Sequence, residues 1–174
     1  MLQPFKTKNT MIQIELKQSI IDYSKELVDN NNFGQRSYDN GNKKEQLIGI
    51  VSENTIRNYL GYELIEAKGF DGGYDIMYKG MRTDIKSMTR KVEPKPYYVN
   101  NIFDAQIKNN SQAYIFSSLN VSNKILTICG WITKDEFISK ATFYAKGAER
   151  IRGKEKFILR ANNWEIENKD LNYF

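Results

Sequence analysis

Apolar residues recur along this chain at two different spacings. Over residues 10–30 and 44–60 they lie three or four positions apart, which predicts two amphipathic helices. Gly61 follows the second helix as its C-terminal cap, because glycine readily adopts the left-handed conformation that ends a helix. Beyond it, short apolar runs bounded by glycine, asparagine and proline predict strands at 62–67, 74–78, 82–87, 112–119, 124–132, 157–161 and 164–167.

Polar and proline-containing stretches separate these elements. Residues 30–42 and 88–99 predict loops, and residues 100–110 are interpreted as a further helix. Thr133 precedes Glu136 by three positions, a capping-box pattern that marks the start of a short helix.

This order of elements predicts an α/β fold, in which a central mixed β-sheet is flanked by helices and preceded by an N-terminal helical extension. No linker is long enough to divide the chain, so residues 1–174 are predicted to form one domain. Within it, 1–43 is the helical extension and loop, 44–132 is the core, and 133–174 holds a C-terminal helix, a basic loop and strands.

The composition is informative mainly because it excludes several classes of catalytic and metal site. The chain has no histidine, which removes Ser-His-Asp and Cys-His catalysis, zinc–histidine sites and histidine-dependent nuclease mechanisms. Its single cysteine, Cys129, lies in an apolar run and cannot form an internal disulfide. No apolar run reaches the roughly 18–20 residues that span a bilayer, and the first ten residues lack the apolar stretch of a signal peptide. We therefore expect a soluble cytoplasmic protein without a membrane partner.

A predicted hairpin in the middle of the chain carries the candidate chemistry, because it brings two aspartates together. With Lys79 and Gly80 as its turn, Asp75 lies opposite Asp84 at a Cβ separation of roughly 4.5–5.5 Å, and Lys86 projects on the same face. Like charges that meet across a ladder cost stability, so a cation is expected between them. Mg²⁺ takes carboxylate oxygens, water and substrate phosphate, and Mn²⁺ is expected to substitute for it.

Several lysines in the chain follow an acidic residue two positions earlier, so this spacing alone has little specificity. Context distinguishes Asp84-Ile85-Lys86, which lies on a predicted strand after another strand aspartate and a helix with acidic residues. These residues resemble the PD-(D/E)XK nuclease superfamily, whose pattern is a helical Glu, a strand Asp, and then Asp or Glu, any residue, and Lys on the paired strand. Glu53 and Asp75 take the first two places, and Tyr74 stands where the family pattern has proline.

The resemblance covers roughly residues 44–132 and implies a metal-dependent nuclease with a restriction-endonuclease-like core. Asp75 and Asp84 would hold Mg²⁺, with the main-chain carbonyl of Ile85 as a further ligand. The ion would polarise the phosphate and lower the pKa of a bound water. Glu53 would bind the ion or orient its waters from the neighbouring helix.

Lys86 would orient the attacking water or stabilise charge on the transition state. Glu45 is the alternative helical carboxylate, because Glu53 could also be an ordinary solvated helix residue. Lys86 has a structural alternative too, as a strand-edge charge that opposes aggregation. Gln106 matches a glutamine that some family members carry, although a helical glutamine is more often a surface residue.

The formal charge of +5 favours a polyanionic partner, although the abundance of Asn, Ile and Tyr also fits the codon bias of an AT-rich genome. Tyr97 and Tyr98 could stack on bases or anchor a loop. The candidate nucleic-acid contacts are Arg82, Arg90, Lys91, Lys95, Arg150, Arg152 and Lys154.

The first hypothesis is a Mg²⁺-dependent endonuclease of phage, mobile-element or restriction type. It would act on DNA, with RNA as an alternative substrate, and work as a homodimer so that two sites reach two strands. The second hypothesis is a catalytically inactive nucleic-acid-binding or interaction module of the same fold.

Overall fold

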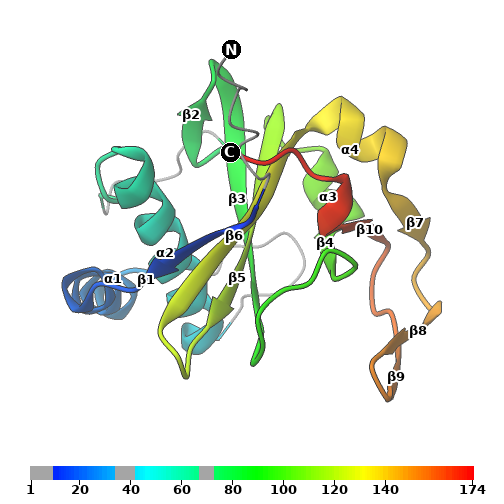
Figure 1. The fold of residues 1–174 in the computed structure, drawn as a ribbon, viewed down its shortest axis with the longest axis horizontal. Helices are drawn as coiled ribbons and strands as arrows, with labels where there is room; N and C mark the ends of the chain where they lie inside the picture. Colours follow the sequence, from blue (N-terminus) through cyan, green and yellow to red (C-terminus); the bar gives the residue numbers. More distant parts are fainter. Residues whose placement is uncertain (1–9, 34–41, 67–72) are drawn as a thin grey trace, which may run out of the picture.

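The structure, a computed structural model, describes residues 10–33, 42–66 and 73–174. Its centre is a five-stranded mixed sheet with the strand order β1-β6-β5-β3-β2 (Figure 1). β3 runs parallel to β5, and the other neighbouring strands run antiparallel. The strands are β1 (Ile12–Glu15), β2 (Ile76–Tyr78), β3 (Met81–Thr89), β5 (Ala113–Asn120) and β6 (Ile125–Thr133).

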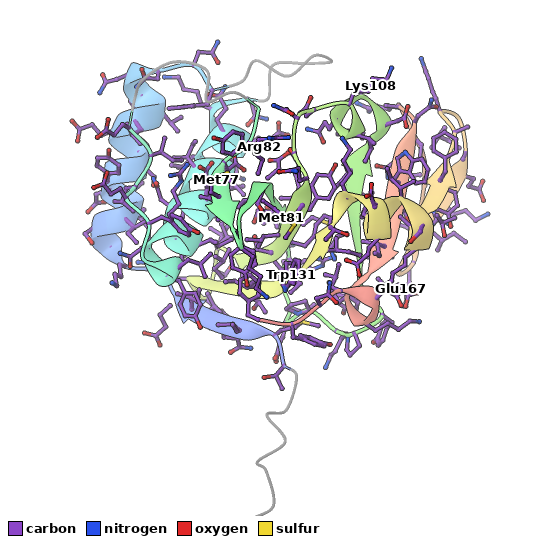
Figure 2. The ribbon with its side chains drawn as sticks, turned by 90° about the horizontal axis from the view of Figure 1, so that it is seen from above. Met77, Met81, Arg82, Lys108, Trp131 and Glu167 are labelled. Atoms are coloured by element: carbon purple, nitrogen blue, oxygen red, sulfur yellow. The ribbon has the colours of Figure 1, made fainter. Side chains whose placement is uncertain are left out.

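Two helices lie on one side of this sheet, as Figure 2 shows. α2 (Lys43–Leu60) packs on the sheet through Ile56, which shares a buried cluster with Ile115 of β5. α1 (Gln18–Asn30) packs in turn against α2. α2 ends at Gly61, whose φ of 80° is the left-handed cap that the sequence predicts.

A second layer covers the opposite face of the sheet (Figure 2). It consists of a three-stranded sheet of order β4-β10-β7 together with α3 and α4, and a separate β8–β9 hairpin extends from it (Figure 1). The core between the two sheets contains Ile102, Tyr114, Phe116, Ile132, Phe137 and Ile166. The elements are β4 (Val99–Phe103), α3 (Asp104–Ile107), α4 (Lys134–Lys140), β7 (Thr142–Tyr144), β8 (Glu149–Arg152), β9 (Glu155–Ile158), β10 (Asn163–Glu167) and the short 3₁₀ helix η1 (Asn168–Asp170).

The α/β class and the mixed sheet flanked by helices are confirmed. The N-terminal helical extension is wrong in its first part, because β1 is the fifth strand of the central sheet and pairs with β6. Ile12 and Ile14 of β1 pack against the cluster beneath α2, while Gln13 and Glu15 between and after them are exposed. Buried and exposed residues thus alternate with the period of a strand. The helix predicted over residues 10–30 wrongly included this strand together with α1.

Other boundaries also differ. Residues 62–66 form no strand, and the predicted helix at 100–110 is instead strand β4 followed by the short α3, because β4 pairs with β10. β7 and β8 were not predicted, and the basic loop near the C-terminus is largely the β8–β9 hairpin. Residues 1–9 of the predicted extension, most of the loop at 30–42 and the end of the strand at 62–67 lie outside the described residues. In the part of the chain that the structure describes, no helix is long and apolar enough to cross a membrane.

Candidate active site

The β2–β3 hairpin has the turn and the register that the sequence predicts. Lys79 and Gly80 both have positive φ angles, 49° and 76°, as a two-residue primed turn requires. Tyr78 pairs with Met81 across the turn, and the ladder continues back to Ile76, the first residue of β2. Continued by one residue, this register would place Asp75 opposite Asp84, but the Asp75 N–H donates to the carbonyl of Thr83 at 3.0 Å, so the pairing shifts by one residue just before β2. The directly opposed Asp75–Asp84 pair that the sequence predicts is therefore replaced by an irregular one, in the manner of a β-bulge.

The hairpin brings Asp75, Asp84 and Lys86 together. The N–H of Ile85 donates to Asp75 Oδ2 at 2.6 Å, which fixes that carboxyl group against β3. Lys86 Nζ lies 2.7 Å from Asp84 Oδ2. Along β3, Ile85 faces the cluster beneath α2, so Asp84 and Lys86 project toward the opposite layer. Three of the predicted site residues therefore meet at one place.

The surroundings of Asp75 favour its protonated form. Burial of the carboxyl group raises its pKa well above the ordinary value, and the charges of Glu53 and Asp84 raise it further. A hydrogen bond with the Asp84 side chain acts in the same direction, and the positive charge of Lys86 partly opposes these effects. An unshielded pair of carboxylates is thus costly here, and a proton or a cation between them relieves that cost.

Glu53, on α2, lies close enough to Asp75 for its charge to raise the pKa of that carboxyl group. Its Oε1 lies 2.8 Å from Arg57 Nε, one turn further along the helix. Arg57 also donates to the main-chain carbonyl of Asp75 and so ties α2 to the start of β2. Sequence reasoning missed Arg57, although its position four residues after Glu53 on a predicted helix was a usable signal.

Tyr114 is a second residue that sequence reasoning missed. It pairs with Asp84 in the parallel register between β3 and β5, and it is completely buried. Burial and the charge of Asp84 raise the pKa of its phenol above the usual range. Among the described residues its hydroxyl has no hydrogen-bond partner. The sequence offered no signal for this residue, because its position in an apolar strand is typical of a core side chain.

The carboxyl pair fits a hard divalent cation by its donor chemistry. Within the described residues, no group of three or more acidic or cysteine side chains is arranged to hold a metal ion. Mg²⁺, however, is usually held by one or two carboxylates, with water and substrate phosphate completing its shell. Asp75 and Asp84 can supply those two carboxylates. Ile85 contacts Asp75 through its N–H, and its carbonyl stays a predicted ligand.

Lys86 also lines a cleft of about 320 Å³ between α2 and the second layer. Glu45 and Gly49 of α2 form one wall, and Gln106 of α3 belongs to the other. Both residues that the sequence offered as alternatives, Glu45 and Gln106, therefore face the same space as Lys86. Glu45 and Glu53 lie about 12 Å apart along the helix axis, so each is near a different part of the site.

The predicted nucleic-acid contacts divide into two groups. Lys91, Lys95 and Lys154 are exposed. The side chains of Arg82, Arg90 and Arg150 are held by the protein itself, through bonds to the Asn110 carbonyl, the Val99 carbonyl and the Glu165 carboxylate respectively. The side chain of Arg152 lies outside the described part of the structure. Among the predicted contacts whose side chains the structure describes, the three lysines are thus the most accessible charges.

The chain matches no protein-family model, no curated protein and no solved structure. Its function therefore has to follow from the chemistry of the site. That site combines two adjacent carboxyl groups, an ammonium group and a helical acid beside a cleft.

Proposed function

We propose that this protein is a metal-dependent endonuclease that hydrolyses DNA phosphodiester bonds, with Mg²⁺ as its ion and Mn²⁺ as a substitute. The observation that carries the proposal is the meeting of Asp75, just before β2, with Asp84 and Lys86 of β3, where Lys86 also lines a cleft. Phosphodiester hydrolysis needs charge stabilisation and an activated water, and this set of side chains can provide both without histidine.

Each residue has a distinct part in the proposed reaction. Asp75 and Asp84 would hold the ion, which when bound supplies Lewis-acid polarisation of the phosphate and its attacking water. Lys86, 2.7 Å from Asp84, presents its ammonium group to the negative charge that develops on the phosphate. Arg57 keeps Glu53 close to Asp75, so that Glu53 can orient water or contribute a further oxygen.

The electrostatics of the carboxyl pair support a cation as its natural partner. The raised pKa of Asp75 means that its proton is held tightly when no cation is present. Binding of a divalent cation has to displace that proton, so affinity for the ion should fall as the pH is lowered. The wider proposal keeps the phage, mobile-element or restriction context and the homodimer as expectations, since two sites are needed to cut two strands.

An inactive module of the same fold is the second candidate, and one observation favours it. The charges of the site are already paired within the protein, Lys86 with Asp84 and Arg57 with Glu53. Such pairs could stabilise a binding module without any ion.

A cleavage assay separates the two candidates. Purified protein is incubated with linear, circular and branched DNA in Mg²⁺ or Mn²⁺, beside Asp84→Asn and Lys86→Met. Asp84→Asn removes a carboxylate that would hold the ion, and Lys86→Met removes the ammonium group. Each should lower the rate of DNA cleavage at least about 10²-fold. Lys25→Met, a change of the same type on the exposed surface of α1, should cleave like the wild type. A folded wild-type protein that cleaves none of these DNAs, or variants that cleave as fast as it does, would refute the nuclease.

The same assay identifies the helical carboxylate. Glu53→Gln should slow cleavage, because Glu53 is the helical acid that acts on Asp75. Glu45→Gln is the matched comparison, since Glu45 lines the cleft with Lys86 instead. A larger loss in Glu45→Gln would assign the role to the alternative residue.

A further inference from the structure

A second and larger cavity, of about 650 Å³, lies between the end of β3, the segment after it and the β8–β9 hairpin. This volume falls within the range of roughly 300–1,000 Å³ that is typical of small-molecule sites. Its walls include Arg90, Tyr97, Tyr98, Arg150 and Phe157. None of these side chains has a part in the proposed hydrolysis.

The cavity adjoins the cleft that contains Lys86. Met88 and Thr89 line both spaces, so the two are neighbours along β3. Thr89 lies three positions after Lys86 along the strand, a distance of about 10 Å. Because stacked nucleotides follow one another at about 3.4 Å along a strand, a DNA strand in the cleft can reach the cavity within a few nucleotides.

Aromatic rings and a guanidinium group dominate one wall. Tyr97 is 65% exposed, and its ring packs edge-on against Tyr98 at a centroid distance of 5.2 Å. The guanidinium of Arg90 lies 5.4 Å from the centre of the Tyr98 ring, which holds Tyr98 in place behind Tyr97. An exposed ring with a fixed partner behind it is a surface on which a nucleobase can stack.

A buried carboxylate gives the cavity a polar group. Glu165 is only 5% exposed, and Arg150 binds both of its oxygens, with Nε to Oε1 at 3.3 Å and Nη2 to Oε2 at 2.5 Å. Arg150 is itself stacked on Tyr144, 3.8 Å from the ring centre. Arg150 is thus committed to this carboxylate and Arg90 donates to the Val99 carbonyl, so an aromatic wall whose two cations are already paired suits the flat face of a base better than a phosphate.

We infer that this cavity binds one unstacked nucleobase of the substrate strand, a few nucleotides from the phosphate at Lys86. The inference rests on the proposed nuclease function and specifies its substrate class. A base in continuous duplex has to be unpaired and unstacked before it can enter such a cavity, whereas a base in a fork, branch or single strand does not. The favoured substrate is therefore DNA with unpaired nucleotides beside the cleaved bond.

The test measures binding without cleavage. Oligonucleotides that carry the fluorescent base 2-aminopurine at an unpaired position of a fork are titrated with the full chain in EDTA, beside a fully paired duplex. Stacking on Tyr97 should quench the fluorescence, and Tyr97→Ala should weaken fork binding about 5-fold to 100-fold. Tyr97→Phe keeps the ring and should bind like the wild type. Tyr59→Ala removes another exposed tyrosine, on α2 and outside the cavity wall, and should also leave binding unchanged.

The outcomes distinguish this inference from the nuclease proposal. If the wild type prefers the paired duplex, or if Tyr97→Ala binds the fork as tightly as the wild type, the base-binding cavity is refuted even where Mg²⁺-dependent cleavage is observed. If no DNA is cleaved but Tyr97→Ala still loses fork binding and Tyr97→Phe retains it, the cavity stands and the nuclease fails. Cleavage of forks faster than duplexes, with that preference lost in Tyr97→Ala, supports both.

Discussion

At the scale of single residues, Asp75 shows how the site balances charge against stability. Its carboxyl group is enclosed, accepts one main-chain hydrogen bond and faces two other acids. The neighbouring Lys86 offsets only part of this effect. Because the pKa of Asp75 is raised on folding, this group stabilises the folded protein at pH values below its ordinary pKa of 3.8. That stabilisation is lost as the pH rises through the raised pKa.

Asp75→Asn should therefore stabilise the metal-free protein at neutral pH. The amide keeps an oxygen for the Ile85 N–H and, beside Glu53 and Asp84, removes the cost of either binding a proton or burying a negative charge on folding. Thermal unfolding in EDTA should give a higher midpoint for the variant at pH 8, and the difference should shrink as the pH falls toward 4. Addition of Mg²⁺ should raise the midpoint of the wild type more than that of the variant, because an ion that binds only the folded protein stabilises it. A variant less stable than the wild type at pH 8 would contradict the like-charge account.

At the scale of elements, short-range signals in the sequence were the most dependable. The capping box predicted from Thr133 and Glu136 is present at the start of α4, with the Thr133 side chain accepting from the Glu136 N–H and the Glu136 side chain accepting from the Thr133 N–H. The predicted basic loop, by contrast, was not identified as a hairpin from the sequence. Arg150 of β8 pairs with Glu165 of β10, a long-range contact that fixes the β8–β9 hairpin to β10. The predicted basic loop, which includes the candidate nucleic-acid contacts Arg150, Arg152 and Lys154, is in large part a hairpin.

Thr133→Ala should lower the free energy of unfolding by about 0.5–2 kcal/mol, the usual cost of losing an N-cap side chain. The Thr133 hydroxyl and N–H lower the pKa of Glu136. The stabilisation that the charged Glu136 side chain gains from these bonds is therefore present at pH values above its ordinary pKa of 4.5, and it is lost as the pH falls through the lowered pKa. Urea denaturation at pH 7 and pH 3 measures both effects. Thr133→Ser, which keeps the hydroxyl, is the control, and an equal loss in Thr133→Ser would show that the hydroxyl is not responsible.

At the scale of the whole molecule, the net charge of +5 can attract a polyanion mainly through those cations that the fold leaves accessible to solvent. Lys91 and Lys95 are exposed, and they belong to the segment between Arg90 and Tyr97, two residues that line the proposed base-binding cavity. Arginines committed to the protein's own carbonyl and carboxylate groups add less to a phosphate-binding surface.

Lys91→Met and Lys95→Met should each weaken DNA binding at low salt by a similar factor for all sequences. Each should also reduce the slope of log affinity against log salt concentration by about 1, because one phosphate contact and its released counterion are lost. Binding isotherms at several salt concentrations give this slope, and Lys25→Met on α1 should leave it unchanged. Slopes identical to the wild type in both variants would place the DNA elsewhere on the surface.

The sequence by itself determined the features that depend on neighbours along the chain. The Lys79-Gly80 turn determined the register of the β2–β3 ladder, and the spacing of apolar residues determined α2, which Gly61 caps. These features follow from local backbone preferences and side-chain periodicity, which are written directly in the order of residues.

Only the tertiary structure decided the features that join distant segments. It added residues 12–15 to the sheet through pairing with β6, placed Glu53 rather than Glu45 beside Asp75, and bound Arg150 to Glu165. It also formed the cavity beside Tyr97 from segments far apart in the chain. Such contacts depend on the packing of whole elements, and one-dimensional spacing carries little information about which long-range partner each side chain will meet.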